Sequence, residues 1–220
     1  MKRIVFDSSS IISLTNNCFF SFFEHLKDDV NAELLIGKGV YDETVSSALK
    51  SKKFRVQAYR INHLVNSGIF TLVKDKNLDN ETKTFLGVSN NLLFVNNQGV
   101  KIIQYGEAEC VAIHKIKPVD LFIVDERTTR YLLEDLNQLK NLIEKRLHTP
   151  VRLNPKMQGE LDSYFGNVAI GRSTELIKYG FEKNYFPGLS KDKRFLEGLL
   201  WSLKLSGCAI NTSEIDSYLK

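Results

Sequence analysis

The chain has few of the residues that build cross-linked or zinc-binding proteins. Its three cysteines, Cys18, Cys110 and Cys208, are far apart and odd in number, so they give neither a zinc-ligand spacing nor a disulfide framework. The four histidines likewise show no ligand spacing. Because structural disulfides are rare in the reducing cytosol, this cysteine usage predicts a cytoplasmic protein.

Long hydrophobic runs are also lacking. No segment approaches the roughly 18 to 20 apolar residues that cross a bilayer, so we expect no membrane association. Asp7 interrupts the apolar run after Lys2 and Arg3 within three residues, which does not fit a signal peptide. There is no Gly-rich phosphate loop, no G-x-S-x-G elbow and no aromatic RNA-binding motif, so the enzyme and RNA-binding classes that depend on them are not indicated.

What is present is an ordinary globular composition. Hydrophobic residues make up 43% of the 220 and charged residues 25%, with a formal net charge of +4. The length suits either one domain of about 150 residues with an appendage or one large domain. The small positive charge permits an anionic partner without requiring one.

Short apolar runs alternate with helical segments over the first 150 residues. This alternation predicts an α/β fold with a central parallel sheet. Asn and Gly between two apolar runs predict a β-hairpin, with residues 92–95 and 100–103 as its arms. The expected strands are 3–6, 33–36, 69–73, 120–124 and a short 151–153. The expected helical segments are 9–26, 40–65, 107–116 and 127–147. The first of these is either one helix or two short ones.

After Asn154 the pattern contains helices only. Helix starts are predicted at Ser173, at Asp192 and at Thr212 or Ser213, by the capping preferences of Ser, Thr and Asp. The sequence therefore predicts an α/β domain over residues 1–153 and a helical C-terminal extension over 154–220.

Acidic residues recur where the apolar runs end. Asp7, Glu43, Glu107 and Asp125 each follow such a run or begin the next helix. Parallel strands gather their carboxyl ends along one edge, so these four carboxylates are expected to converge. Like charges held close together are costly unless a cation neutralises them. Carboxylates are hard ligands suited to Mg²⁺ or Mn²⁺, so the pattern predicts a divalent metal site.

Each of these acids also has a purely structural interpretation. Asp7 and Asp125 stand where a helix N-cap is expected, and Glu43 and Glu107 lie in first helical turns, which favour acids. In the functional interpretation Asp7 binds metal while Ser9 caps and orients the helix. Glu43 is preferred over its neighbour Asp42 on helical spacing. Glu109 lies about 200° from Glu107 around the helix and is expected in solvent.

Basic residues offer two interpretations as well. A run from Lys50 to Arg60, with Lys52, Lys53 and Arg55 inside it, contains no acid. It is either a solvated helix face or a surface that guides an RNA backbone. Arg127 and Arg130 either bind phosphate or pair with nearby acids such as Glu134.

With these motifs in place, the chain resembles the PIN-domain family. The matching segments are residues 4–12, 40–43, 106–112 and 122–127, in the family's order and rough spacing. The resemblance implies a Rossmann-like α/β/α sandwich and a Mg²⁺- or Mn²⁺-dependent ribonuclease acting on single-stranded or structured RNA. It assigns Asp7, Glu43, Glu107 and Asp125 as a catalytic, metal-binding quartet, with Ser9 as the supporting hydroxyl. One departure is Glu107, since many toxin members have Asp at this position.

Three functional hypotheses follow. The first is a metal-dependent endoribonuclease. The second is a non-catalytic RNA-binding or scaffold protein on the same fold, because fold alone does not fix function. The third is a toxin-type nuclease held inactive by an inhibitory partner protein. The C-terminal helices, through Phe195, Leu199, Leu200 and Trp201, pack either on their own domain or across a homodimer.

Overall fold

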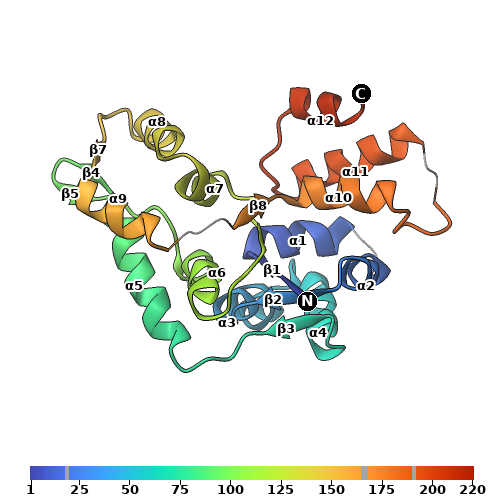
Figure 1. The fold of residues 1–220 in the computed structure, drawn as a ribbon. Helices are drawn as coiled ribbons and strands as arrows, with labels where there is room; N and C mark the ends of the chain where they lie inside the picture. Colours follow the sequence, from blue (N-terminus) through green and yellow to red (C-terminus); the bar gives the residue numbers. More distant parts are fainter. Residues whose placement is uncertain (18–19, 165–167, 190–191) are drawn as a thin grey trace.

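The computed structural model describes residues 1–17, 20–164, 168–189 and 192–220 (Figure 1). Its centre is a five-stranded sheet in which each strand runs parallel to its neighbours and helices flank the sheet, the arrangement of a Rossmann-like sandwich. The predicted α/β class is thus confirmed. In order across the sheet the strands are β3 (Phe70–Leu72), β2 (Ala32–Ile36), β1 (Lys2–Phe6), β6 (Leu121–Ile123) and β8 (Ala169–Gly171).

The strand order creates a reversal beside β1. Val5 of β1 is in register with Leu35 of β2 on one side and with Phe122 of β6 on the other. The chain first builds outward from β1 through β2 and β3, then returns to the opposite side with β6. Such a switch point is where open α/β sheets place their ligand sites. Asp7 follows β1 directly, and Asp125 lies two residues after β6.

Helices cover the sheet and connect its strands. In Figure 1, α1 lies between the sheet and the pair α10–α11. Within the described ranges, no helix is both long and apolar enough to cross a membrane. The helices are α1 (Ser8–Asn17), α2 (Phe20–Asp29), α3 (Lys38–Tyr41), η1 (Asp42–Ser47), η2 (Ala48–Lys50), α4 (Arg55–Asn66), α5 (Leu78–Asn90), α6 (Tyr105–Ile116), α7 (Arg127–Glu134), α8 (Leu136–Leu147), α9 (Pro155–Asp162), α10 (Ser173–Glu182), α11 (Lys193–Leu205) and α12 (Thr212–Tyr218).

Two long helices predicted from the sequence are broken in the structure. The segment 40–65 is interrupted after η2, where Ser51 is extended. The segment 127–147 is interrupted at Asp135, which is also extended. The Asp135 carboxylate accepts hydrogen bonds from the backbone N–H groups of Asn137 and Gln138, at 2.9 and 3.0 Å. Asp135 therefore acts as the N-cap of a new helix, a role its side chain favours over a helix interior.

A second, antiparallel sheet lies apart from the first. It joins β4 (Leu93–Val95) to β5 (Gln98–Gly99) and to β7 (Arg152–Leu153). The predicted hairpin is confirmed, but its loop is only Asn96-Asn97, both with positive φ of 50° and 63°. A two-residue turn with positive φ at both positions matches the twist of the paired strands. The second arm therefore begins at residue 98, and the segment 100–103 that was expected to form it is not a strand.

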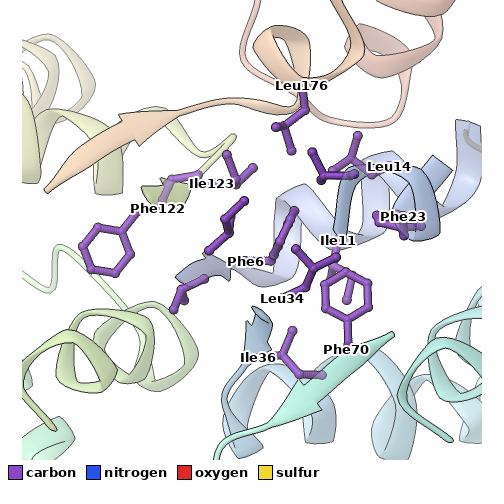
Figure 2. Close-up of a cluster of buried hydrophobic side chains, with 14 of the residues drawn as sticks. Phe6, Ile11, Leu14, Phe23, Leu34, Ile36, Phe70, Phe122, Ile123 and Leu176 are labelled. Atoms are coloured by element: carbon purple, nitrogen blue, oxygen red, sulfur yellow. The ribbon is translucent and has the colours of Figure 1, made fainter. Parts of the chain in front are cut away.

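The buried apolar side chains form two clusters. The larger lies around the central sheet and α1, and Figure 2 shows Phe6, Leu14, Ile123 and Leu176 within it. The smaller joins α5, α8, α9 and the second sheet, with Phe85 and Leu139 fully buried. Burial of this apolar surface is the main force that holds the elements together.

The expectation of helices alone after residue 154 is wrong. Strand β8 pairs with β6, with Ile170 opposite Phe122, and completes the central sheet. It was missed because three residues with a single large apolar side chain give no strand pattern. The helix starts predicted at Ser173 and Thr212 are confirmed, and Asp192 caps α11 by accepting from the Arg194 N–H at 2.9 Å. Residues of α10, α11 and α12 belong to the larger cluster.

Replacing Gly180 tests the packing of α10. A Cβ at this position would lie 2.5 Å from Cε2 of Phe22 and 3.0 Å from Cδ2 of Tyr185. We expect Gly180→Ala to lower the free energy of unfolding by about 1–3 kcal/mol through overpacking. The matched control is Gly87→Ala, because a Cβ on this helical glycine meets nothing within 4 Å. It should stabilise by about 0.5–1 kcal/mol. Urea denaturation measures both, and equal effects would contradict the packing.

Candidate acidic site

The switch point beside β1 holds a small pocket rich in carboxylates, which we call the acidic pocket. Its volume is about 240 Å³. No lysine or arginine of the described residues lines it. Its carboxylates come from four separate segments of the chain: β1's end, η1, α6 and the start of α7. The lining residues are Asp7, Ser8, Ser9, Ile12, Glu43, Gln104, Gly106, Glu107 and Glu126.

Asp7 is the most buried of these acids. Its side chain is 2% exposed. It accepts hydrogen bonds from the Ser10 N–H and from the Ser9 hydroxyl, both at 2.7 Å. Asp7 therefore caps α1 while it lines the pocket. The prediction that Ser9 caps this helix is wrong, because its hydroxyl donates to Asp7 instead. Burial, together with the negative charge of Asp125, raises the pKa of Asp7 to about 7, against the lowering effect of the two serines.

Glu43 is exposed and enters the pocket from η1. Its carboxylate accepts a hydrogen bond from the Ser8 hydroxyl at 2.7 Å. Its neighbour Asp42 points elsewhere, since it pairs with Lys38 and accepts from Ser46. The structure thus places Glu43, and not Asp42, in the acidic pocket, as the helical spacing predicted.

Glu107 enters from the first turn of α6. It accepts a hydrogen bond from the Gln104 N–H at 2.5 Å and forms part of a capping box. Burial raises the pKa of Glu107, and the charges of Glu126 and Glu43 raise it further. Three of the predicted quartet, Asp7, Glu43 and Glu107, are therefore brought together.

Asp125 does not line the acidic pocket. Its side chain is fully buried behind the pocket. The carboxylate accepts hydrogen bonds from the Ser13 hydroxyl at 2.5 Å and from the Ser173 N–H at 2.8 Å. It thus joins α1 to the start of α10, and its charge acts on Asp7 in the pocket.

Glu126 occupies the place expected for Asp125. It lines the pocket, and it also caps α7 by accepting from the Thr129 N–H at 2.7 Å. The alternative that Asp125 caps this helix is therefore wrong. The sequence could have indicated Glu126 as the cap, because a side-chain acceptor at the N-cap lies opposite the free N–H of the residue three positions later, here Thr129.

The prediction that Glu109 faces solvent is wrong. It is 2% exposed and accepts a hydrogen bond from the Gly39 N–H at 2.6 Å. A Cβ on Gly37 would lie 2.1 Å from its Oε2, so a glycine is needed there. Burial raises the pKa of Glu109, opposed by the N–H groups at the start of α3. A second face of α6, which includes Glu109, packs against α3. Helical periodicity in the sequence does not reveal this contact.

The predicted RNA-binding residues do not converge on the acidic pocket. Lys52, Lys53 and Arg55 are exposed before and at the start of α4, and Arg127 is exposed on α7. Arg130 pairs with Glu134 at 3.4 Å, which is the structural alternative considered for it.

The donor chemistry of the pocket fits a hard divalent cation, but its geometry is not preassembled. Four carboxylates offer only oxygen ligands, which Mg²⁺ and Mn²⁺ favour. In the described part of the chain, however, no three acidic, histidine or cysteine side chains already surround a metal position. Their oxygens instead accept from the Ser8 and Ser9 hydroxyls and from three backbone N–H groups. A bound cation would require these carboxylates to rotate toward a common centre.

Comparison of the chain with known protein families, with curated proteins and with solved structures gives no match.

The different roles of Asp125 and Glu43 predict different effects on stability. Asp125→Ala leaves the buried Ser173 N–H without its acceptor and removes the shorter of two hydrogen bonds from the Ser13 hydroxyl, which should cost about 1–3 kcal/mol. Glu43→Ala removes an exposed carboxylate and should change stability by about 0.5 kcal/mol or less. Chemical denaturation in EDTA compares the two, and a similar loss in both would contradict the buried position of Asp125.

The raised pKa of Asp7 predicts a pH-dependent effect of Asp7→Asn. Between its ordinary value of 3.8 and about 7 the folded protein holds a proton that the unfolded chain has lost. This group therefore lowers wild-type stability as the pH rises through that interval. Asn avoids the buried charge and keeps the acceptor for Ser10, so the variant should gain up to about 4 kcal/mol over wild type at pH 8 and almost nothing near pH 4.

Urea titrations in EDTA from pH 4 to 8 measure this difference. Asp162→Asn, at an exposed position of α9, is the matched control and should show no such trend. A constant difference between Asp7→Asn and wild type across the interval would contradict the raised pKa.

Proposed function

We propose that the protein is a metal-dependent endoribonuclease of PIN type that hydrolyses RNA phosphodiester bonds at the acidic pocket. One observation carries the proposal. Asp7, Glu43 and Glu107 come from distant parts of the sequence and line one pocket at the switch point of a parallel sheet. The resemblance of the surrounding segments to the PIN family supports both the fold and the reaction.

The charge balance of the pocket favours a cation. Asp7 lies near the buried Asp125 and shares its pocket with three glutamates. Without a cation, this repulsion is relieved by a proton on Asp7. A divalent ion would relieve the same repulsion at neutral pH, so a metal ion and a proton would compete for Asp7.

The residues that would hold Mg²⁺ or Mn²⁺ are Asp7, Glu43, Glu107 and Glu126. Such an ion, when bound, lowers the pKa of a coordinated water and offsets the charge of the phosphate. The Ser8 and Ser9 hydroxyls orient Glu43 and Asp7. Asp125, held by Ser13 and Ser173, acts from behind as a positioning residue that keeps α1 and its cap in place.

A second hypothesis is favoured by one observation. Each pocket carboxylate already accepts a hydrogen bond from the chain itself, as expected of a non-catalytic RNA-binding protein with a relic site. The cytoplasmic location, the homodimer and the inhibitory partner stay predictions from the sequence.

RNA cleavage by purified variants tests the proposal. We expect wild type to cleave a labelled mixed RNA pool with Mg²⁺ or Mn²⁺ and not with EDTA. Asp7→Asn should reduce the rate by about 100-fold or more, because it removes an electrostatic contact of the reacting groups. Asp162→Asn should cleave like wild type. Cleavage that survives in folded Asp7→Asn would contradict the assignment.

Metal binding needs a separate measurement. Mn²⁺ should raise the thermal unfolding midpoint of wild type at pH 8, because a ligand that binds only the folded state stabilises it, and should raise that of Asp7→Asn less. Salt-sensitive RNA binding with neither cleavage nor a metal effect would favour the non-catalytic hypothesis.

A further inference from the structure

A second and larger hollow adjoins the acidic pocket. We call it the tyrosine groove; it is lined in part by Tyr41, Leu72, Val73, Lys74, Leu78 and Tyr105. Its volume is about 1080 Å³, above the usual range for a small-ligand site. It lies beyond the end of β3, between α3 and the first turns of α5 and α6.

The groove and the acidic pocket share their dividing wall. In the pair Asp42-Glu43, the first residue lines the groove and the second lines the pocket; the pair Tyr105-Gly106 is divided in the same way. The wall is the close contact between α3 and α6, where a Cβ on Gly39 would lie 3.0 Å from Cδ1 of Tyr105 and 3.3 Å from the Cα of Gly106. The groove therefore borders the pocket across this contact.

The groove combines an aromatic side chain with apolar surroundings. Tyr105 is 37% exposed, and its hydroxyl donates to Asp79 at 2.8 Å, which fixes the ring in place. Burial and this hydrogen bond raise the pKa of Tyr105 to about 12, so the ring stays neutral. Leu72, Val73 and Leu78 contribute apolar surface beside it.

The groove is lined by acids as well as lysines, but lysines prevail among its exposed charges that form no ion pair with another described residue. Asp75 lies between the two lysines Lys74 and Lys76, and Glu109 is buried against the Gly39 N–H. Asp42 is paired with Lys38, and Asp79 with Lys83 at 2.6 Å. Lys74 and Lys76 are exposed and form no ion pair with any other described residue. The groove therefore suits a neutral planar group that is joined to an anionic backbone.

We propose that the tyrosine groove takes up one unpaired base of single-stranded RNA, stacked on Tyr105, next to the phosphate that lies at the acidic pocket. Lys74 and Lys76 contact the phosphate on the other side of this base. The inference rests on the proposed function for the identity of the ligand. A duplex keeps its bases stacked inside, whereas an unpaired base can leave the stack and lie on an aromatic side chain.

Binding measured in EDTA tests the groove without cleavage. We expect Tyr105→Ala to weaken the binding of a fluorescent single-stranded RNA by about 10-fold, the usual size of one base–aromatic stack. Tyr105→Phe keeps the ring and should restore most of the affinity. A blunt duplex of the same sequence should bind both variants and wild type equally.

An abasic nucleotide gives the sharper test. Placed in turn at each position of the RNA, it should weaken binding to wild type at one position by about the same factor as Tyr105→Ala. At that position it should have no further effect on Tyr105→Ala, because both changes remove one contact. Additive losses, or no sensitive position, would overturn the proposal.

The exposed lysines keep the test valid if Tyr105→Ala proves unstable. Lys74→Glu with Lys76→Glu should weaken single-strand binding and reduce its salt dependence, while Lys145→Glu, an exposed control on α8, should not. An unchanged affinity in the double variant would overturn the proposal. The proposal would also be overturned if the double variant changed the oligomeric state of the protein and left RNA binding unchanged, because the groove would then bind a second copy of the chain.

The outcomes separate this inference from the proposed function. Metal-dependent cleavage by wild type with normal RNA binding by all groove variants would reject the groove and leave the nuclease intact. Groove variants that lose single-strand binding, in a protein that never cleaves, would reject the nuclease and support the groove.

Discussion

The structure depends on a buried pair of carboxylates beside its central strands. Asp7 follows β1 and Asp125 follows β6, and both are almost inaccessible to solvent. Each is stabilised by a serine hydroxyl and a backbone N–H of a helix start, at Ser9 and Ser10 for Asp7 and at Ser13 and Ser173 for Asp125. Because buried charges are tolerated only with such partners, these contacts fix how α1 and α10 meet the sheet.

The two acids have different roles in this arrangement. Asp7 combines an N-cap with a place in the pocket, while Asp125 is wholly occupied by structural contacts. Glu126, the next residue, reaches the pocket instead. A one-residue shift is enough, because successive residues at a strand's end point in different directions.

The sequence predicted the α/β class, three of the pocket's acids and the capped helix starts, because each depends on local signals. A run such as Ile4-Val5-Phe6, or a cap such as Asp192, is recognisable without knowledge of its neighbours. It did not predict β8, the burial of Glu109 or the role of Asp125. Each of these depends on a contact with a distant segment: β8 with β6, Glu109 with Gly39, and Asp125 with Ser173.

The contact between Asp125 and Ser173 also sets the order in which the molecule is completed. Residue 173 leaves the ribosome 48 positions after residue 125, so a nascent chain carries the Asp125 carboxylate without one of its two donors until α10 has begun. β8 comes just before α10 in the chain, and α11 follows, so these elements are made after Asp125 as well. Long-range contacts of this kind form late because the loop must close first. The sheet edge at Asp125 therefore reaches its final geometry only after residues 169–173 have been made, later than the other four strands.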